Sequence, residues 1–142
     1  MIYYPLQIDP HISEQLARCK LIALDFDGVL TDNSVMHDQN GVESVQRSKA
    51  DSLGVDLLDD ALLYNKNSYE NTDHAVDIII LSRETNPMVT SVGNKMHIKV
   101  IQSITDKLQA LKYEIEKRNI QIEQVIFMGN DLNDLECVNA VG

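Results

Sequence analysis

Two aspartates, two positions apart, follow the first strongly apolar run of the chain. Asp25 and Asp27 come directly after residues 21–24, which have the composition of a buried strand. At a strand end both carboxylates can point into one crevice, where two unit charges about 4 Å apart repel by roughly 4 kcal/mol at an effective dielectric of about 20. Such a pair tends to share a proton or to bind a cation, and ligands that are all oxygen favour Mg²⁺.

A second group of oxygen donors follows the apolar run 125–128. It is the segment Gly-Asn-Asp-Leu-Asn-Asp at residues 129–134. Ligands of an open parallel sheet bind outside the carboxyl ends of its strands, so the two acidic groups meet if their strands are neighbours. One point would then be surrounded by Asp25, by the region of Asp27, and by Asn130 or Asp131. These residues would form a partial Mg²⁺ shell, which water and a substrate phosphate complete.

Two further segments supply groups that suit a phosphoryl oxygen. Ser82 and Arg83 follow the apolar run 78–81, and Lys107 lies in the first turn of a predicted helix. A hydroxyl, an ammonium group and a backbone amide at a helix start are the donors that a phosphoryl group needs. Taken alone, the serine is typical of a cap, the lysine of a solvated surface and the acidic pair of a turn. Their order at successive strand ends favours one shared site.

Strand-like and helix-like segments alternate along the chain. Four apolar runs predict strands, at 21–24, 78–81, 98–101 and 125–128. The clearest helix is predicted from Thr105 to about Asn119, where apolar residues recur at spacings of three and four, and Asn86-Pro87 predicts a helix start. This alternation indicates an α/β fold, a Rossmann-like three-layer α/β/α structure with a parallel sheet.

Two segments depart from this alternation. Residues 34–45 predict two short strands around the turn signal Asn40-Gly41, and therefore a β-hairpin. The hairpin directly follows the acidic end of the first strand, so it should stand over that end as a small flap in place of a cap domain. The polar stretch from Tyr64 to Asp77 predicts an irregular loop.

Composition limits the classes of partner. The chain has 142 residues, enough for one domain, and its 12 basic and 22 acidic residues give a formal charge of −10. A negative field repels nucleic acid and anionic membranes, so we expect neither as a partner. The absence of a long apolar run and of a signal-peptide pattern predicts a cytoplasmic protein. Cys19 and Cys137 lack metal-ligand spacing and fit packed, reduced thiols.

The candidate residues resemble the four motifs of the haloacid dehalogenase superfamily of phosphotransferases. The matching segments are Asp25 to Asp32, Leu81 to Arg83, Lys107, and Gly129 to Asp134. The hairpin after the first motif and the segment 49–54 are similar to the capless branch of that superfamily. This branch includes 3-deoxy-D-manno-octulosonate 8-phosphate phosphatases and the C-terminal domain of some N-acylneuraminate cytidylyltransferases. The resemblance places a phosphatase-like domain at residues 21–142 and makes residues 1–20 an N-terminal extension.

The resemblance implies a Mg²⁺-dependent phosphatase that hydrolyses a phosphorylated sugar acid, of the 3-deoxy-octulosonate 8-phosphate or nonulosonate 9-phosphate type. It makes Asp25 the nucleophile that forms an aspartyl-phosphate, Asp27 the general acid and then base, and Lys107 the charge beside Asp25. The substrate phosphate is assigned to Ser82, Arg83, Gly28 and Lys107. The Mg²⁺ ion is assigned to Asp25, Asp27, Asn130 and Asp131. The branch also implies a homotetramer in which a neighbouring subunit helps to close the site.

Two features leave other interpretations open. Asn130 stands where most active members of the family carry an aspartate, and an amide oxygen is a weaker, neutral Mg²⁺ ligand. The chain also stops at Gly142, before the C-terminal strand and tail that the family leads us to expect. Both favour a weakly active or inactive domain that serves assembly or regulation beside an acylneuraminate cytidylyltransferase. A signalling receiver domain fits less well, because its phosphorylated aspartate and its lysine follow a different order.

Overall fold

The structure is a computed structural model that describes residues 9–68 and 76–141, with the side chains of residues 59–68 left out. Its helices are α1 (Pro10–Arg18), α2 (Lys49–Ser68), α3 (Met88–Lys95), α4 (Lys107–Arg118) and α5 (Leu135–Ala140), with the 3-10 turns η2 (Ile122–Gln124) and η3 (Leu132–Asp134). Its strands are β1 (Leu21–Leu24), β2 (Val35–His37), β3 (Glu43–Val45), β4 (Asp77–Leu81), β5 (Lys99–Ile101) and β6 (Val125–Met128).

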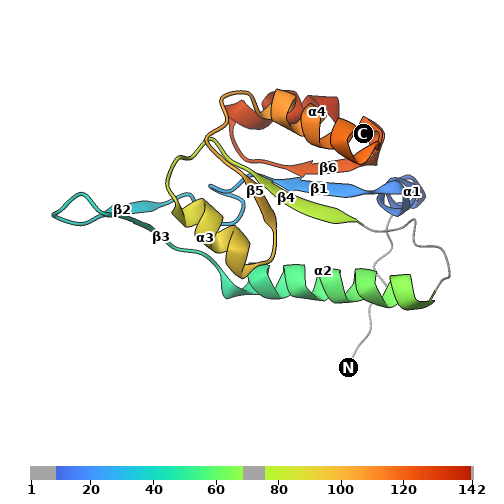
Figure 1. The fold of residues 1–142 in the computed structure, drawn as a ribbon, viewed down its shortest axis with the longest axis horizontal. Coiled ribbons are helices and arrows are strands. Elements are labelled where there is room, and N and C mark those ends of the chain that lie inside the picture. Colours follow the sequence, from blue (N-terminus) through green and yellow to red (C-terminus); the bar gives the residue numbers. More distant parts are fainter. Residues whose placement is uncertain (1–8, 69–75, 142) are drawn as a thin grey trace.

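Four parallel strands form the central sheet in the order β5-β4-β1-β6 (Figure 1). β1 lies between β4 and β6, and its Leu24 pairs with Ile80 on one side and Met128 on the other. These strands are almost continuously apolar because both faces of the sheet are covered. The four predicted strands and the α/β fold class are therefore confirmed.

Helices cover both faces of the sheet and make three layers, with α4 and α5 on one side and α2 and α3 on the other (Figure 1). Successive strand residues point to opposite faces, so each face has its own apolar cluster. Leu21 packs in the cluster of Leu111 of α4, whereas Leu24 packs in that of Val89 of α3 and Val55 of α2. No helix in the described ranges is both long and apolar enough to cross a membrane.

The hairpin is formed as predicted. β2 and β3 pair with each other in the antiparallel direction, and they project away from the main sheet (Figure 1). The turn is built by Asp38, whose carboxylate accepts hydrogen bonds from the backbone N–H groups of Asn40 and Val42, both at 2.8 Å. Gly41 adopts φ of +77°, a conformation that glycine adopts without steric penalty.

The predicted loop from Tyr64 to Asp77 is wrong at its beginning, because α2 continues to Ser68. The prediction relied on polarity, but a helix that has started gains one hydrogen bond for each added residue. The segment 64–68 holds no proline or glycine that would end it. Asp77 opens β4, and residues 69–75 lie outside the described part of the chain.

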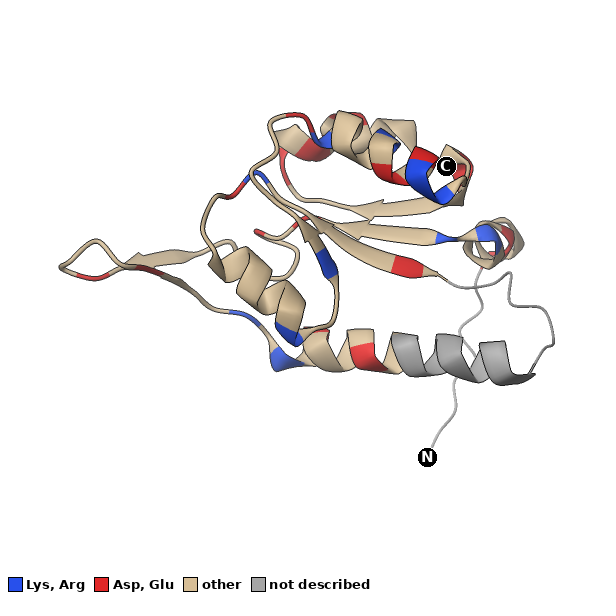
Figure 2. Cartoon of the chain, in the orientation of Figure 1, with Lys and Arg blue, Asp and Glu red and all other residues tan. Residues whose placement is uncertain are grey.

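Charged residues attach the C-terminal end of α4 to the amino edge of the sheet, and Figure 2 shows charged positions on both. Glu114 is 3% exposed, and both of its carboxylate oxygens lie 2.7 Å from Lys99 Nζ of β5. Glu114 also pairs with Arg118, whose Nε donates to Asp77 of β4 at 2.8 Å. Burial opposes ionisation of Glu114, but the hydrogen bonds and charges of Lys99 and Arg118 outweigh it and lower its pKa.

Glu114→Gln should destabilise the fold by about 2 kcal/mol at pH 7, because it removes the buried carboxylate that Lys99 and Arg118 share and leaves Arg118 paired with Asp77 alone. Since the pKa of Glu114 is lowered from 4.5, this stabilisation is present above pH 4.5 and is lost as the pH falls through the folded-state pKa. Urea unfolding at pH 7 and pH 3.5 measures the effect, with the exposed Glu116→Gln as control. If the free energies of unfolding of Glu114→Gln and the parent differ by the same amount at pH 7 and pH 3.5, the ionic contribution is refuted.

Candidate active site

The register of the sheet brings the predicted residues to one edge. Because Leu24 is level with Ile80 and Met128, the segments that follow β1, β4 and β6 all leave the sheet at its carboxyl edge. The Asp25 N–H donates to the Met128 carbonyl at 2.9 Å and continues the strand pairing into the site. A cavity of about 350 Å³ opens at this edge. Its lining includes the predicted residues Asp25, Asp27, Ser82, Arg83, Lys107, Asn130 and Asp131.

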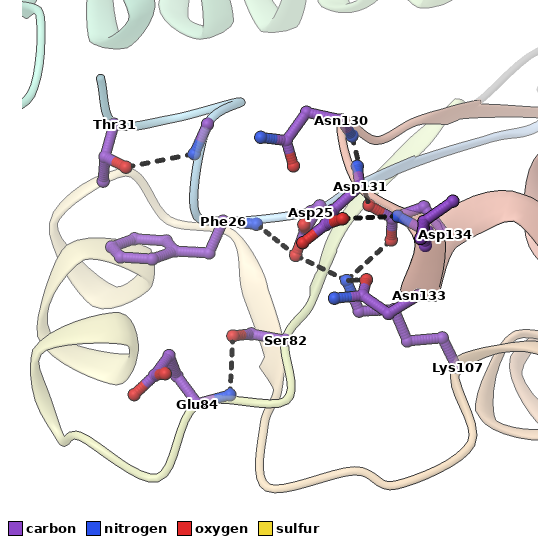
Figure 3. A network of polar contacts seen from close by, with 12 residues as sticks. Asp25, Phe26, Thr31, Ser82, Glu84, Lys107, Asn130, Asp131, Asn133 and Asp134 are labelled. Carbon is purple, nitrogen blue, oxygen red and sulfur yellow. Dashed lines mark hydrogen bonds and ion pairs between the residues drawn. The ribbon is translucent and has the colours of Figure 1, made fainter. Parts of the chain in front are cut away.

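Lys107 is the centre of the polar network (Figure 3). Its Nζ lies 2.7 Å from Asp25 Oδ1, 2.6 Å from Asp134 Oδ1 and 2.9 Å from Asn133 Oδ1. An ammonium group has three hydrogens, so these three contacts use all of them. Lys107 thereby joins the strand end of β1 to the segment that follows β6.

The position of Lys107 is electrostatically unfavourable for a cation that has no partner. It is the first residue of α4 and only 4% exposed, and a cation at a helix N-terminus faces the positive end of the helix dipole. Asp25 and Asp134, 5% and 1% exposed, supply the compensating negative charge. Burial raises the pKa of Asp25 despite the hydrogen bond from Lys107. For Asp134, burial is outweighed by Lys107 and by backbone N–H groups, so its pKa is lowered.

The two oxygens of Asp25 have different surroundings. Oδ1 accepts from the Phe26 N–H at 2.7 Å and contacts Lys107, whereas Oδ2 accepts no hydrogen bond from any residue that the structure describes. The carboxylate is therefore oriented through one oxygen, and the other remains available to a ligand in the cavity. This arrangement suits either a nucleophile or a metal ligand.

Asp27 lies on the same cavity in a less buried position. Its pKa is raised, first by burial and then by the negative charge of Glu84, while Lys107 acts in the opposite direction. A carboxyl group with a raised pKa is suited to carry a proton that it can give to a leaving group.

The segment after β4 supplies a hydroxyl and a guanidinium group. Ser82 is 1% exposed, and its Oγ accepts from the Glu84 N–H at 3.0 Å, which leaves the hydroxyl hydrogen to donate. Arg83 is exposed and lines the cavity, and it has no hydrogen bond or ion pair with the part of the chain that the structure describes. Both side chains can reach an anionic ligand without breaking a protein contact.

Gly28 has a different environment from the one that its predicted phosphate contact requires. Its N–H donates to Thr31 Oγ1 at 3.2 Å, and Gly28 does not line the cavity. Its φ is +77°, and a Cβ built on it would lie 1.8 Å from Asn130 Nδ2. The absence of a side chain at Gly28 therefore makes room for Asn130, so the structure places Gly28 behind a candidate metal ligand.

The donors near Asn130 fit a hard cation. Asp134 Oδ2 accepts from the N–H groups of Asn130 and Asp131, at 3.1 and 3.3 Å, and so shapes this segment. Asp131 Oδ1 caps η3 by accepting from the Leu132 N–H at 2.6 Å. The described residues hold no group of three or more His, Cys, Asp or Glu side chains suited to a metal ion. A cation here would depend on Asp25, backbone and amide oxygens and water, a set that suits Mg²⁺.

Three residues of this network, Asn133, Asp134 and Glu84, were not predicted from the sequence to be site residues. Asp134 and Asn133 lay within the predicted run of oxygen donors but were not singled out, and Glu84 lies two positions after Ser82. Asp134 could have been found from its spacing of three residues from Asp131, which is typical of a capping box. In the structure these two aspartates form a capping box at η3, in which the side chain of each accepts from the backbone N–H of the other.

Comparisons with known proteins found sequences similar to this chain. The model of the haloacid dehalogenase-like hydrolase family matches residues 63–142. The chain is 27% identical to the 3-deoxy-D-manno-octulosonate 8-phosphate phosphatase of Salmonella typhimurium, over 95% of this chain and 65% of that protein. It is 26% identical to the N-acylneuraminate cytidylyltransferase of Oncorhynchus mykiss, over 87% of this chain and 26% of that protein. The chain thus spans just under two thirds of one relative and about a quarter of the other.

A solved structure shows the same fold. The 3-deoxy-D-manno-octulosonate 8-phosphate phosphatase of Moraxella catarrhalis, crystallised with a magnesium ion, a phosphate ion and KDO, superposes with a TM-score of 0.77. The two chains are 28% identical, and the match covers 93% of this chain and 69% of that one.

Lys107→Met should destabilise the protein by about 3 kcal/mol, because it leaves Asp25 and Asp134 buried without their shared cation. Urea unfolding at pH 7 measures the change, and Lys112→Met, at an exposed position of the same helix, is the matched control. Equal stability of the two variants would show that the buried contacts of Lys107 contribute nothing.

Gly28→Ala and Gly41→Ala form a matched pair, since both glycines have φ of +77° and only Gly28 has neighbours within 4 Å of an added Cβ. Both variants should lose about 1–2 kcal/mol from the left-handed backbone conformation. Only Gly28→Ala should also shift the NMR signal of the Asn130 side-chain amide. An unchanged amide signal would refute the assigned contact.

Proposed function

Because this chain belongs to the haloacid dehalogenase-like hydrolases, we propose that it is a Mg²⁺-dependent phosphatase that hydrolyses a phosphorylated sugar acid. The observation that carries this proposal is the orientation of Asp25 by Lys107, with one carboxylate oxygen left available to a cavity that also holds Ser82 and Asn130. Phosphoryl transfer needs mainly positioning and charge neutralisation, and this arrangement provides both.

In the first step Asp25 is the nucleophile. A carboxylate oxygen forms a bond to phosphorus while the ester bond from phosphorus to the sugar oxygen breaks, which gives an aspartyl-phosphate and an alkoxide. Asp27, on the same cavity, gives its proton to that alkoxide. In the second step Asp27 takes a proton from water, the water oxygen bonds to phosphorus, and the bond to Asp25 breaks to release inorganic phosphate.

The phosphoryl oxygens would be held by Ser82 and Arg83. The buried hydroxyl of Ser82 and the guanidinium group of Arg83 are free to donate. Lys107 contributes chiefly by orienting Asp25 and balancing its charge, because its three hydrogens are already used. A direct contact of Lys107 with the phosphate would require it to release one partner, and the neutral Asn133 is the weakest of the three.

The residues present fit a Mg²⁺ ion held by Asp25, the backbone carbonyl of Asp27 and the oxygens of Asn130 or Asp131. The bound ion would supply positive charge to the phosphoryl oxygens. Asp25, Asp27, Asn130 and Asp131 all line the cavity, and all of their donors are the hard oxygen ligands that Mg²⁺ prefers.

The sugar-acid substrate is supported by the octulosonate phosphatases among the relatives. We also propose a homotetramer, in which a neighbouring subunit covers the cavity. The hairpin that would meet it exposes Val35, Met36 and Val42, each more than half accessible. The buried, unpaired thiols of Cys19 and Cys137 fit a reducing compartment such as the cytoplasm.

A second candidate function is a weakly active or inactive domain that serves assembly or regulation beside a cytidylyltransferase. The observation that favours it is Asn130, a neutral ligand at a position where a carboxylate would bind Mg²⁺ more strongly. The similarity to the N-acylneuraminate cytidylyltransferase of Oncorhynchus mykiss is consistent with such a role.

Asp25→Asn should reduce the hydrolysis of octulosonate 8-phosphate and nonulosonate 9-phosphate by at least about 1,000-fold, because an amide is a poor nucleophile. Removing divalent metal with EDTA should abolish turnover, and added Mg²⁺ should restore it. Phosphate release measures both effects, and the exposed Asp56→Asn serves as control. Hydrolysis that persists after the Asp25→Asn substitution or after EDTA treatment would refute the proposed mechanism. A folded, Mg²⁺-saturated protein that releases no phosphate from either ester would favour the second candidate.

A further inference from the structure

One face of the hairpin belongs to the cavity. In the β2–β3 ladder Val35 pairs with Val45 and His37 pairs with Glu43. Directly paired residues, and residues two apart on one strand, share a face. These four residues therefore lie on one side of the hairpin, and Val35, Val45 and Glu43 line the cavity. The intervening Met36 and Ser44 belong to the opposite side and do not line it.

Glu43 brings a carboxylate with unused acceptor capacity to this wall. Its Oε2 accepts from Asn86 Nδ2 at 3.4 Å, and its Oε1 lies 3.9 Å from His37 Nδ1. The first contact is long for a hydrogen bond and the second is beyond one. Each oxygen of Glu43 can therefore accept stronger hydrogen bonds from a ligand.

Asn86 is fixed independently of Glu43. Its Oδ1 accepts from the Met88 N–H at 3.0 Å at the beginning of α3, and its backbone carbonyl accepts from Gln102 Nε2 at 3.4 Å. The amide oxygen is thus turned toward α3, which leaves Nδ2 to face the hairpin and Glu43. Asn86 is a positioning residue that connects the hairpin to the rigid part of the fold.

The charges around the cavity indicate which groups this wall accepts. Glu43 and Glu84 both line the cavity and add negative charge to it. The described lining also holds two cations, Lys107 and Arg83, but all three hydrogens of the Lys107 ammonium group are already donated to protein oxygens. A further anionic group of the substrate is unfavourable beside the two glutamates, and Arg83 is already assigned to the phosphate. Hydroxyl groups, which donate hydrogen bonds, suit the glutamates.

We propose that Glu43, held by Asn86, is a specificity-determining residue that accepts hydrogen bonds from hydroxyl groups of the leaving group. The two carboxylate oxygens match two neighbouring hydroxyls, so the preferred substrate is a polyhydroxylated phosphomonoester whose diol faces the hairpin. This inference rests on the proposed function, because the phosphate bound at Asp25 defines which part of the substrate reaches the hairpin.

The test compares Glu43→Ala and Glu43→Gln with Glu116→Ala, an exposed position on α4. The substrates are 3-deoxy-D-manno-octulosonate 8-phosphate and phenyl phosphate, which has no hydroxyl group to contact Glu43. Glu43→Ala should lower kcat/KM for the sugar ester by about 10-fold to 100-fold, the range for a hydrogen bond to a charged group, and leave phenyl phosphate within about twofold. Glu43→Gln should lose less, because its amide oxygen still accepts. Equal losses for both substrates, or no loss for either, would overturn the proposal.

A binding measurement separates this inference from the proposed reaction. Titration calorimetry with the Asp25→Asn variant gives affinities for the sugar ester and for inorganic phosphate without turnover. Adding Glu43→Ala should lower the affinity for the sugar ester about 10-fold or more and leave that for phosphate unchanged. If the parent protein releases no phosphate, the proposed phosphatase activity is refuted. The affinity for the sugar ester relative to that for inorganic phosphate, with and without Glu43→Ala, would still decide the role of Glu43. If Asp25→Asn binds the ester no more tightly than phosphate, the proposed role of Glu43 is refuted.

Discussion

The shared contact of Lys107 with Asp25 and Asp134 determines the arrangement of the site. One ammonium group faces two buried carboxylates at 2.7 and 2.6 Å, so the three side chains keep one excess negative charge inside the protein. An uncompensated buried charge is strongly unfavourable, and a cation beside Asp25 would offset it. This imbalance is the physical reason to expect a divalent ion at this edge of the sheet. A bound cation there would also reduce the repulsion between a chain with a formal charge of −10 and the proposed phosphate ester.

α4 transmits this constraint to the rest of the fold. At one end Lys107 is attached to the segments after β1 and β6, and at the other Glu114 and Arg118 are attached to Lys99 and Asp77 of β5 and β4. The helix between them packs its apolar side chains against the sheet. Two electrostatic attachments at opposite edges fix the helix along its axis, and the packed face fixes its rotation. The position of Lys107 is therefore set by the whole length of α4.

Much of this arrangement was predictable, because the carboxyl ends of parallel strands lie at the same edge of the sheet. Apolar runs located β1, β4, β5 and β6, and the polar residues that follow them met at the carboxyl edge as expected. The role of Asp134 was not predictable, since only the turn of η3 brings its carboxylate back to Lys107. The place of Glu43 depends on which face of an exposed hairpin turns inward, and alternation alone does not choose between the two faces.

The hairpin also has a consequence for how such proteins diversify. β2 and β3 pair only with each other in the described part of the structure, and most of their side chains are exposed. Exchanging residues there changes the free energy of unfolding by little, usually within about 0.5 kcal/mol, while it alters the wall of the cavity. With the roles proposed above, selection can change substrate recognition at the hairpin without altering Asp25, Asp27 or Lys107. The residues proposed for recognition and for reaction then evolve as separate segments of the chain.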